Sequence, residues 1–186
     1  MSFTVAITGR PNVGKSTFFN RMLEERKAIV DNISGVTRDR QYGVAEWNGK
    51  SFNLIDTGGF VPGSADIFET EIRKQVGIAI NEANAVIFMC DAATGITALD
   101  EAMADMLRQS EKPVFLVVNK VDNPERMLDA TEFYSMGFDR IHFLSSISGS
   151  GTGELLDDLV KLIPDTDDDA AGEKDALPKF AIIGQP

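Results

Sequence analysis

The stretch GRPNVGKS, residues 9–16, decides the fold of this chain because it matches the pattern GxxxxGK[ST] in full. It follows an apolar run at residues 3–8 and precedes a stretch with helical spacing, and this is the strand–loop–helix context that the pattern requires. Gly9 and Gly14 allow successive backbone N–H groups to turn inward and form a concave anion site. The N-terminus of the following helix adds a partial positive charge. The stretch therefore predicts a phosphate-binding loop, in preference to a chance glycine turn with a surface lysine.

Outward from this loop, apolar β-branched runs alternate with stretches of helical spacing. The runs predict strands at residues 3–8, 52–56, 85–91, 114–119 and 141–144. The other stretches predict helices at Lys15–Glu25, about Asp66–Glu82, Ala98–Gln109, Glu125–Ser135 and Gly153–Leu162. This alternation predicts an α/β fold with a mostly parallel sheet and helices on both faces. Asn48-Gly49, between two alternating runs, predicts a hairpin, so one edge strand should be antiparallel.

Two further polar stretches follow predicted strands, where open sheets of this class bind their ligands. The first is DTGG, residues 56–59, in which Asp56 can hold Mg²⁺ through water and the Gly59 N–H can meet a γ phosphate. In the phosphate-binding loop, Lys15 can reach the β and γ phosphates, and the Ser16 hydroxyl can ligate the same Mg²⁺. The pattern D-x-x-G alone is common in ordinary turns. Its position directly after a predicted strand favours the interpretation as a metal- and phosphate-binding loop.

The second stretch is NKVD, residues 119–122, and it predicts which base is bound. The Asp122 carboxylate can accept hydrogen bonds from guanine N1–H and the 2-amino group, and adenine offers neither donor. Lys120 can lie along the plane of the base, and Asn119 can connect neighbouring loops. The alternative is a surface turn rich in Asn and Asp, which the order of the loops along the chain disfavours.

Composition fits a globular protein of the cytoplasm. The chain has 186 residues, of which 43% are hydrophobic, enough to fill a sizeable core. Its lone cysteine, Cys90, lies in an apolar run, which excludes an intrachain disulfide and predicts a buried, inert thiol. The N-terminus lacks a secretory layout, and no apolar run approaches the roughly 18 residues of a membrane helix. We therefore expect a cytoplasmic location and no membrane partner.

The acidic charge is concentrated near the C-terminus. Of the net charge of −11, residues 164–178 carry −5, and this proline-bounded, aromatic-free stretch predicts a solvated linker. The next residues, KFAIIGQP at 179–186, repeat four residues of VAITGRP at 5–11 in the same spacing. We therefore expect a body at residues 1–163, an acidic linker, and the start of a second unit.

GRPNVGKS, DTGG and NKVD together resemble the translation-factor-like branch of the P-loop GTPases, and the resemblance covers essentially the whole body. GVTRDR at residues 35–40, DTGGF at 56–60 and the run from Thr94 to Asp122 further resemble the first GTPase domain of the Der (EngA) family of bacterial tandem GTPases. In that family an acidic linker joins the two domains. The resemblance implies that residues 179–186 are the first strand of a truncated second GTPase domain, a partner in cis that cannot itself bind nucleotide.

This resemblance implies a GTPase that hydrolyses GTP to GDP and phosphate with Mg²⁺, acts as a nucleotide-dependent switch, and takes part in assembly of the large ribosomal subunit. The chain itself is expected to be monomeric. The residues that the resemblance and the motifs place at the guanine nucleotide are Gly9, Arg10, Pro11, Asn12, Val13, Gly14, Lys15, Ser16, Thr17, Asp56, Thr57, Gly58, Gly59, Asn119, Lys120, Asp122, Ser145 and Ser146. The Mg²⁺ ligands would be Ser16, Thr37 and Asp56, where Thr37 matches the switch I threonine. Lys15, Thr37, Gly59 and Asn12 would carry catalysis.

Two positions depart from related enzymes. Ser145-Ser146 stands where the family has a Ser-Ala loop at guanine O6. Phe60 follows D-x-x-G, where Ras-like enzymes have a glutamine that orients the attacking water. GTPases resembling this one that have a hydrophobic residue there often use a monovalent cation, which implies K⁺ held by Asn12. Arg10, Arg38 and Arg40 read as surface or switch-packing residues.

Three alternatives stay open at the level of sequence. A P-loop ATPase or kinase would share GRPNVGKS but would not need NKVD. A non-hydrolysing module gated by GTP and GDP would keep every motif, and Phe60 is compatible with it. A GTPase of the same branch that acts in tRNA modification or small-subunit assembly is the third.

Overall fold

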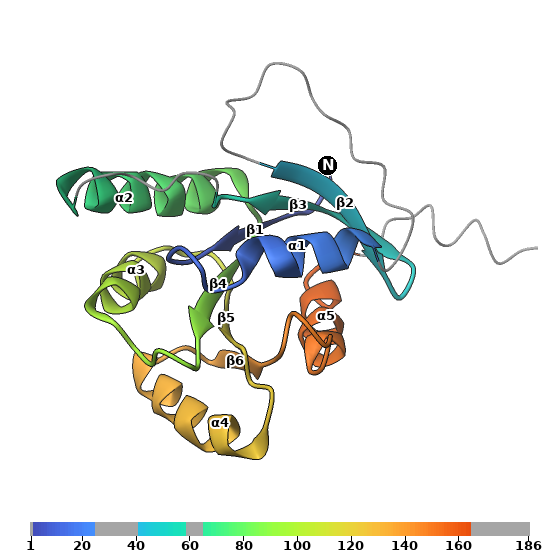
Figure 1. Ribbon diagram of the computed structural model, residues 1–186. Helices are drawn as coiled ribbons and strands as arrows, with labels where there is room; N and C mark the ends of the chain where they lie inside the picture. The colour runs from blue at the N-terminus through green and yellow to red at the C-terminus, as the bar shows by residue number, and fades with distance from the viewer. Residues whose placement is uncertain (1, 25–40, 59–64, 165–186) are drawn as a thin grey trace, which may run out of the picture.

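The computed structural model describes residues 2–24, 41–58 and 65–164, and over these ranges helices cover both faces of one sheet (Figure 1). The strands are β1 (Thr4–Thr8), β2 (Gln41–Trp47), β3 (Lys50–Asp56), β4 (Ala85–Asp91), β5 (Val114–Asn119) and β6 (Arg140–Phe143). The helices are α1 (Lys15–Glu24), α2 (Ala65–Glu82), α3 (Ala98–Arg108), α4 (Pro124–Asp129), the 3-10 helix η1 (Ala130–Met136) and α5 (Thr152–Val160). The predictions for Thr37, Arg38, Arg40, Gly59 and Phe60, and for residues 165–186, fall outside the described residues.

The sheet has the order β2-β3-β1-β4-β5-β6, and β1 lies between β3 and β4, parallel to both. The mostly parallel sheet predicted from the alternation of strands and helices is thereby confirmed. β2 is antiparallel to β3, with Trp47 opposite Lys50 across the turn. Asn48 and Gly49 both have positive φ, 49° and 80°, which is the requirement of a two-residue hairpin turn of type I′. The predicted antiparallel edge strand is therefore confirmed as well.

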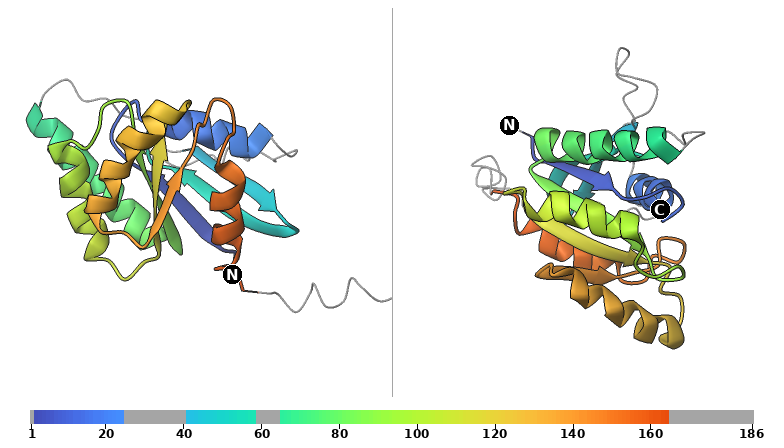
Figure 2. Two further views of the ribbon diagram at one scale, coloured as in Figure 1. Left: turned by 90° about the horizontal axis from the view of Figure 1, so that it is seen from below. Right: turned by 90° about the vertical axis from the view of Figure 1, so that its left-hand side faces the viewer.

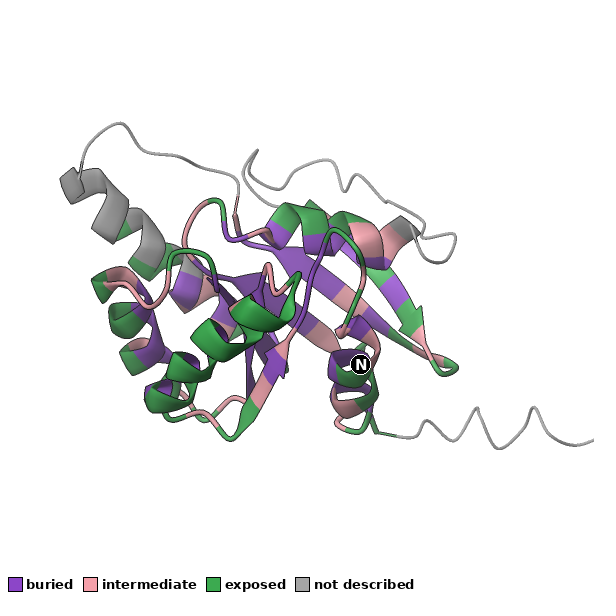
Figure 3. Ribbon diagram, turned by 60° about the horizontal axis from the view of Figure 1, so that its bottom comes forward, coloured by how far each residue is buried: buried purple, intermediate pink, exposed green. Residues whose placement is uncertain are grey.

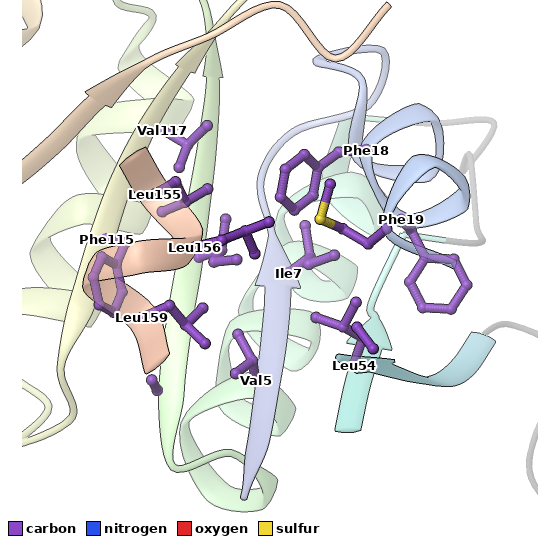
Figure 4. Packing of buried hydrophobic residues seen from close by; sticks show 14 of the residues in the cluster. Val5, Ile7, Phe18, Phe19, Leu54, Phe115, Val117, Leu155, Leu156 and Leu159 are labelled. Carbon is purple, nitrogen blue, oxygen red and sulfur yellow. The ribbon is translucent and has the colours of Figure 1, made fainter. Parts of the chain in front are cut away.

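Alternate residues of β1 face two separate cores, because successive strand side chains point to opposite faces. Val5 and Ile7 pack with α1 and α5, a layer that Figure 4 shows from close by. Ala6 faces the other core, formed with α2, α3 and η1. Figure 2 shows α2 and α3 together on that side of the sheet. The central strands β4 and β5 are buried along their whole length, as the purple interior of Figure 3 shows.

Cys90 lies in this buried part of β4 and is fully inaccessible to solvent. Burial raises the pKa of its thiol, so the reactive thiolate is disfavoured. The predicted burial of this thiol is confirmed. Among residues 2–24, 41–58 and 65–164, none of the helices has both the length and the apolar character needed to cross a lipid bilayer.

One predicted helix was wrong in form. The stretch expected to be a single helix at Glu125–Ser135 is a short α4 followed by the 3-10 helix η1. A 3-10 helix has three residues per turn, so residues at i, i+3 and i+6 lie on one face. In η1 these are Ala130, Phe133 and Met136, and all three are buried in the core. The tighter winding lets this short element cover the core with one face, and Gly137 ends it with a left-handed φ of 72°.

Candidate functional site

The phosphate-binding loop connects β1 to α1 and is held close to the ends of β4 and β5. Gly9 has a φ of +149°, and a Cβ atom there would lie 2.3 Å from the Met89 carbonyl oxygen. Gly14 has a φ of +102°, and a Cβ atom there would lie 2.2 Å from Asn119 Nδ2. Both glycines are therefore required by close approach as well as by backbone conformation. The loop also includes Asn12, whose φ is 66° and whose side chain is exposed.

The Lys15 side chain lies inside the loop. Its Nζ donates to the carbonyl oxygens of Gly9 and Arg10, each at 2.8 Å, and the residue is 6% exposed. Burial lowers the pKa of Lys15 to about 8; the charge of Asp56 opposes this shift, and that of Arg10 adds to it. Gly58 makes room for the lysine, since a Cβ atom there would lie 2.2 Å from Lys15 Cε. The ammonium group is therefore enclosed by two of the predicted loops.

Ser16 and Asp56 meet at the start of α1. Ser16 Oγ donates to Asp56 Oδ2 at 2.9 Å, and the Gly58 N–H donates to Asp56 Oδ1 at 2.9 Å. Burial raises the pKa of Asp56, and the hydrogen bonds from Gly58 and Ser16 and the charge of Lys15 oppose this. A buried carboxylate beside a hydroxyl is a set of hard oxygen donors that fits Mg²⁺. Thr37, the third predicted ligand, lies outside the described residues.

Asn119, at the end of β5, connects three loops. Its Nδ2 donates to the Val13 carbonyl at 2.7 Å, and its Oδ1 accepts from Ser146 N at 2.8 Å and Ser146 Oγ at 3.0 Å. Ser145 is buried, and its Oγ accepts from the Ser148 N–H at 3.3 Å. The two serine hydroxyls therefore hold loops together in this structure, and the Ser146 backbone is also engaged, because its N–H donates to Asn119 and its carbonyl accepts from Arg21 Nε at 2.6 Å.

Lys120 adopts a left-handed φ of 67° and reaches two partners across the site. Its Nζ donates to the Asn12 carbonyl at 2.9 Å and forms an ion pair with Asp91 Oδ2 at 2.6 Å. Asp91 is buried at the end of β4, and its Oδ1 also accepts from the Ala93 N–H at 2.8 Å. Sequence analysis missed Asp91. The available signal was an acid that ends an otherwise apolar strand, the same position that Asp56 has in β3.

The remaining predicted residues have varied environments. Asp122 follows Lys120 by two positions and is exposed, so its carboxylate is accessible to a base. Thr57 is buried and donates from both N and Oγ1 to the Ile7 carbonyl, at 3.2 and 2.8 Å, so its side chain supports the strand rather than a ligand. Val13 is fully buried in the core, whereas Thr17 is exposed on α1.

Arg10 turns away from the loop interior toward α3. Its Nε donates to Asp100 Oδ2 at 3.1 Å, and its Nη2 donates to Thr94 Oγ1. Arg10 was expected to be a surface or switch-packing residue; among the described residues its partners lie on α3 and in the loop before it, and Asp100 was not foreseen. The site as a whole combines a backbone anion nest, an enclosed ammonium group, a Ser–Asp pair and an exposed carboxylate at one edge of the sheet.

Comparisons with known proteins agree with this geometry. The family model described as 50S ribosome-binding GTPase matches residues 4–120. GTPase Der of Christiangramia forsetii is 55% identical over all 186 residues, and GTPase Der of Flavobacterium johnsoniae is 57% identical over 182 residues, or 98% of the chain. The chain spans 42% and 41% of the length of these two relatives.

Solved structures with similar folds include further nucleotide-binding proteins. Era in complex with MgGDPNP and nucleotides 1506–1542 of 16S ribosomal RNA is 28% identical, with a TM-score of 0.70, over 89% of this chain and 58% of that chain. The G domain of the Thermotoga maritima iron transporter FeoB is also 28% identical, with a TM-score of 0.64, over 88% of this chain and all of that one.

Proposed function

The chain belongs to the family of 50S ribosome-binding GTPases, and we propose that it binds GTP with Mg²⁺, hydrolyses it to GDP and phosphate, and acts in assembly of the large ribosomal subunit. The observation that carries the proposal is the bridge made by Asn119. Through one side chain it joins the end of β5, where NKVD begins, to the phosphate-binding loop, and this supports a single site that binds both base and phosphates. The similarity to GTPase Der over the whole chain supports the same function.

Base selection is assigned to Asp122 and Lys120. The Lys120 ammonium is held by Asp91 and the Asn12 carbonyl. These contacts fix the aliphatic part of the Lys120 side chain beside the NKVD loop, which also contains Asp122. The exposed Asp122 carboxylate can accept from the two guanine N–H groups that adenine lacks. These hydrogen bonds to guanine favour binding of GTP over ATP, and they argue against an ATPase or small-molecule kinase.

Phosphate binding is assigned to the backbone nest and to Lys15. In the described structure the Lys15 ammonium donates to two loop carbonyls, and a bound nucleotide would offer phosphate oxygens as stronger, charged acceptors. Ser16 and Asp56 would hold Mg²⁺, and the MgGDPNP bound to Era supports this assignment. When bound, Mg²⁺ neutralises charge that develops on the phosphates. The N-terminus of α1 adds further positive potential at the same place.

The direct test measures binding and phosphate release with GTP and with ATP, in the presence of Mg²⁺. We expect calorimetric binding of GTP and GDP, no comparable binding of ATP, and slow release of phosphate from GTP. Binding without release would favour the non-hydrolysing module gated by nucleotide, whereas equal binding of ATP would contradict the assignment of Asp122.

We also propose that the chain is the first of two tandem GTPase domains and that the large ribosomal subunit is a partner of the intact protein. The greater length of the matched relatives and the repeat of the first strand at residues 179–186 support the tandem arrangement. Sequencing the intact protein tests it, because GQP at residues 184–186 should continue into a second GxxxxGK[ST] stretch. Co-sedimentation of the intact protein with isolated large and small subunits tests the partner, and a preference for the small subunit would contradict it.

Potassium is expected to accelerate hydrolysis through Asn12. The Asn12 carbonyl is held by Lys120 while its side chain stays exposed at the loop, so its amide oxygen is free to serve as a hard ligand for a cation near the phosphates. A cation there would stabilise charge that an arginine finger stabilises in other GTPases. We expect phosphate release to be roughly tenfold faster in KCl than in matched NaCl, which corresponds to a decrease of about 1.4 kcal/mol in the activation free energy.

Two variants make the potassium prediction specific. Asn12→Ala should lose the difference between the two salts, and Asn20→Ala, which alters an exposed asparagine on α1, should keep it. Equal rates in KCl and NaCl for the unmutated chain, with nucleotide binding intact, would rule the cation site out.

A further inference from the structure

We propose that Asp100, on α3, is a positioning residue for the phosphate-binding loop. It holds the Arg10 side chain and thereby fixes the orientation of the Arg10 carbonyl, which accepts a hydrogen bond from Lys15. This inference rests on the nucleotide site proposed above and goes beyond it, since Asp100 lies ninety residues along the chain from Arg10 and outside the three stretches GRPNVGKS, DTGG and NKVD.

Asp100 is completely buried, which is unusual for a carboxylate in the first turn of a helix. Its Oδ2 accepts from Thr97 N at 3.0 Å and Thr97 Oγ1 at 2.7 Å, and Asp100 N donates back to Thr97 Oγ1 at 3.3 Å. These contacts form the capping box of α3. A capping box satisfies the helix end and also works on an exposed helix, so it does not explain why this charge is withdrawn from water.

The Arg10 guanidinium accounts for the burial. Its Nε lies 3.1 Å from the same Oδ2 atom, and the Arg10 side chain is only 14% exposed. A buried carboxylate needs a paired cation and satisfied hydrogen bonds, because desolvation otherwise disfavours the charged form. Arg10 Nη2 also donates to Thr94 in the loop before α3, so the guanidinium is held at two points.

This anchor acts on the part of the loop that contacts Lys15. Arg10 follows Gly9, whose backbone lies against the Met89 carbonyl, and the Arg10 carbonyl accepts from Lys15 Nζ at 2.8 Å. With the backbone held on one side by β4 and the side chain held on the other by α3, the peptide at position 10 keeps one orientation. A loop ordered before the ligand arrives loses less conformational freedom on binding, and this favours affinity.

The test compares GDP affinity, by calorimetry, for the unmutated chain, Asp100→Asn, Arg10→Gln and the double variant. Each single substitution should weaken GDP and GTP binding about tenfold, and the double variant should bind no more weakly than the weaker single one, because coupled residues are not additive. The preference for GTP over XTP should stay unchanged, since the base loop is not touched. Thr97→Ala is the matched control: it breaks the capping box but leaves the ion pair, and its affinity should stay within about twofold.

Several outcomes would overturn the role of Asp100. The first is unchanged GDP affinity in folded Asp100→Asn or Arg10→Gln. The second is a loss of affinity in the double variant that equals the product of the two single losses. The third is a loss of affinity in Thr97→Ala as large as that in Asp100→Asn. Faster phosphate release by Asp100→Asn would also overturn it, because the pair would then be restraining Arg10 from the phosphates. If Asp100→Asn does not fold, Arg10→Gln decides alone. Absence of GDP binding by the unmutated chain would instead overturn the proposed function, and this inference with it.

Discussion

Lys15→Ala is expected to abolish tight binding of both GTP and GDP. The substitution removes the ammonium group that lies inside the phosphate-binding loop, and a charged hydrogen bond to phosphate contributes about 1.5–3 kcal/mol. Lys15 would make more than one such bond, so the affinity should fall by a factor on the order of a hundred or more. Calorimetry with GDP measures this directly, and Lys161→Ala, which alters an exposed lysine at the C-terminal end of α5, is the control.

Stability measurements separate this loss from misfolding. The pKa of Lys15 is lowered to about 8 from its ordinary value of 10.5, mainly by burial, so between these values the unfolded chain binds more protons than the folded one. Without nucleotide, the free energy of unfolding of the unmutated protein should therefore rise between about pH 8 and pH 10.5, and Lys15→Ala should lack this part of the rise. A folded Lys15→Ala that binds GDP with nearly unmutated affinity would contradict the assignment of the loop.

Asp122→Asn is expected to weaken GTP binding and to create binding of XTP. Xanthine has a carbonyl group where guanine has the 2-amino group, so the asparagine amide supplies the matching donor while the carboxylate acceptor is lost. Loss of a charged hydrogen bond of about 1.5–3 kcal/mol corresponds to roughly a ten- to hundredfold loss for GTP. Competition binding with GTP and XTP measures both changes in one experiment.

The matched control is Asp129→Asn, which makes the same chemical change at another exposed position, on α4. It should leave the preference for GTP unaltered. Unchanged GTP affinity in Asp122→Asn, together with no gain for XTP, would show that NKVD does not read the base. Because Lys15→Ala acts on the phosphates and Asp122→Asn on the base, the two variants should differ sharply in their response to XTP.

Several features could be predicted from the sequence because their causes are local. GRPNVGKS contains the glycines of a phosphate-binding loop, and a predicted strand and a predicted helix flank it directly. Asn48-Gly49 supplies the two residues with positive φ that its hairpin turn needs. The apolar runs of β4 and β5 predict strands buried on both faces, and the structure agrees. Parallel strands whose carboxyl ends lie at one edge then bring their loops together, so the candidate residues could be named before their positions were known.

Other features were decided only by the tertiary structure. The winding of η1 depends on a core that three of its residues must reach together. The partners of Asp91 and Asp100 could not be read from the sequence either, because each lies far from its acid along the chain. Asp91 meets Lys120 because β4 lies beside β5, and Asp100 meets Arg10 because the crossover after β4 brings α3 next to the phosphate-binding loop. A buried carboxylate is stable only beside its cation, and which cation that is depends on strand order and helix packing between residues far apart in the chain.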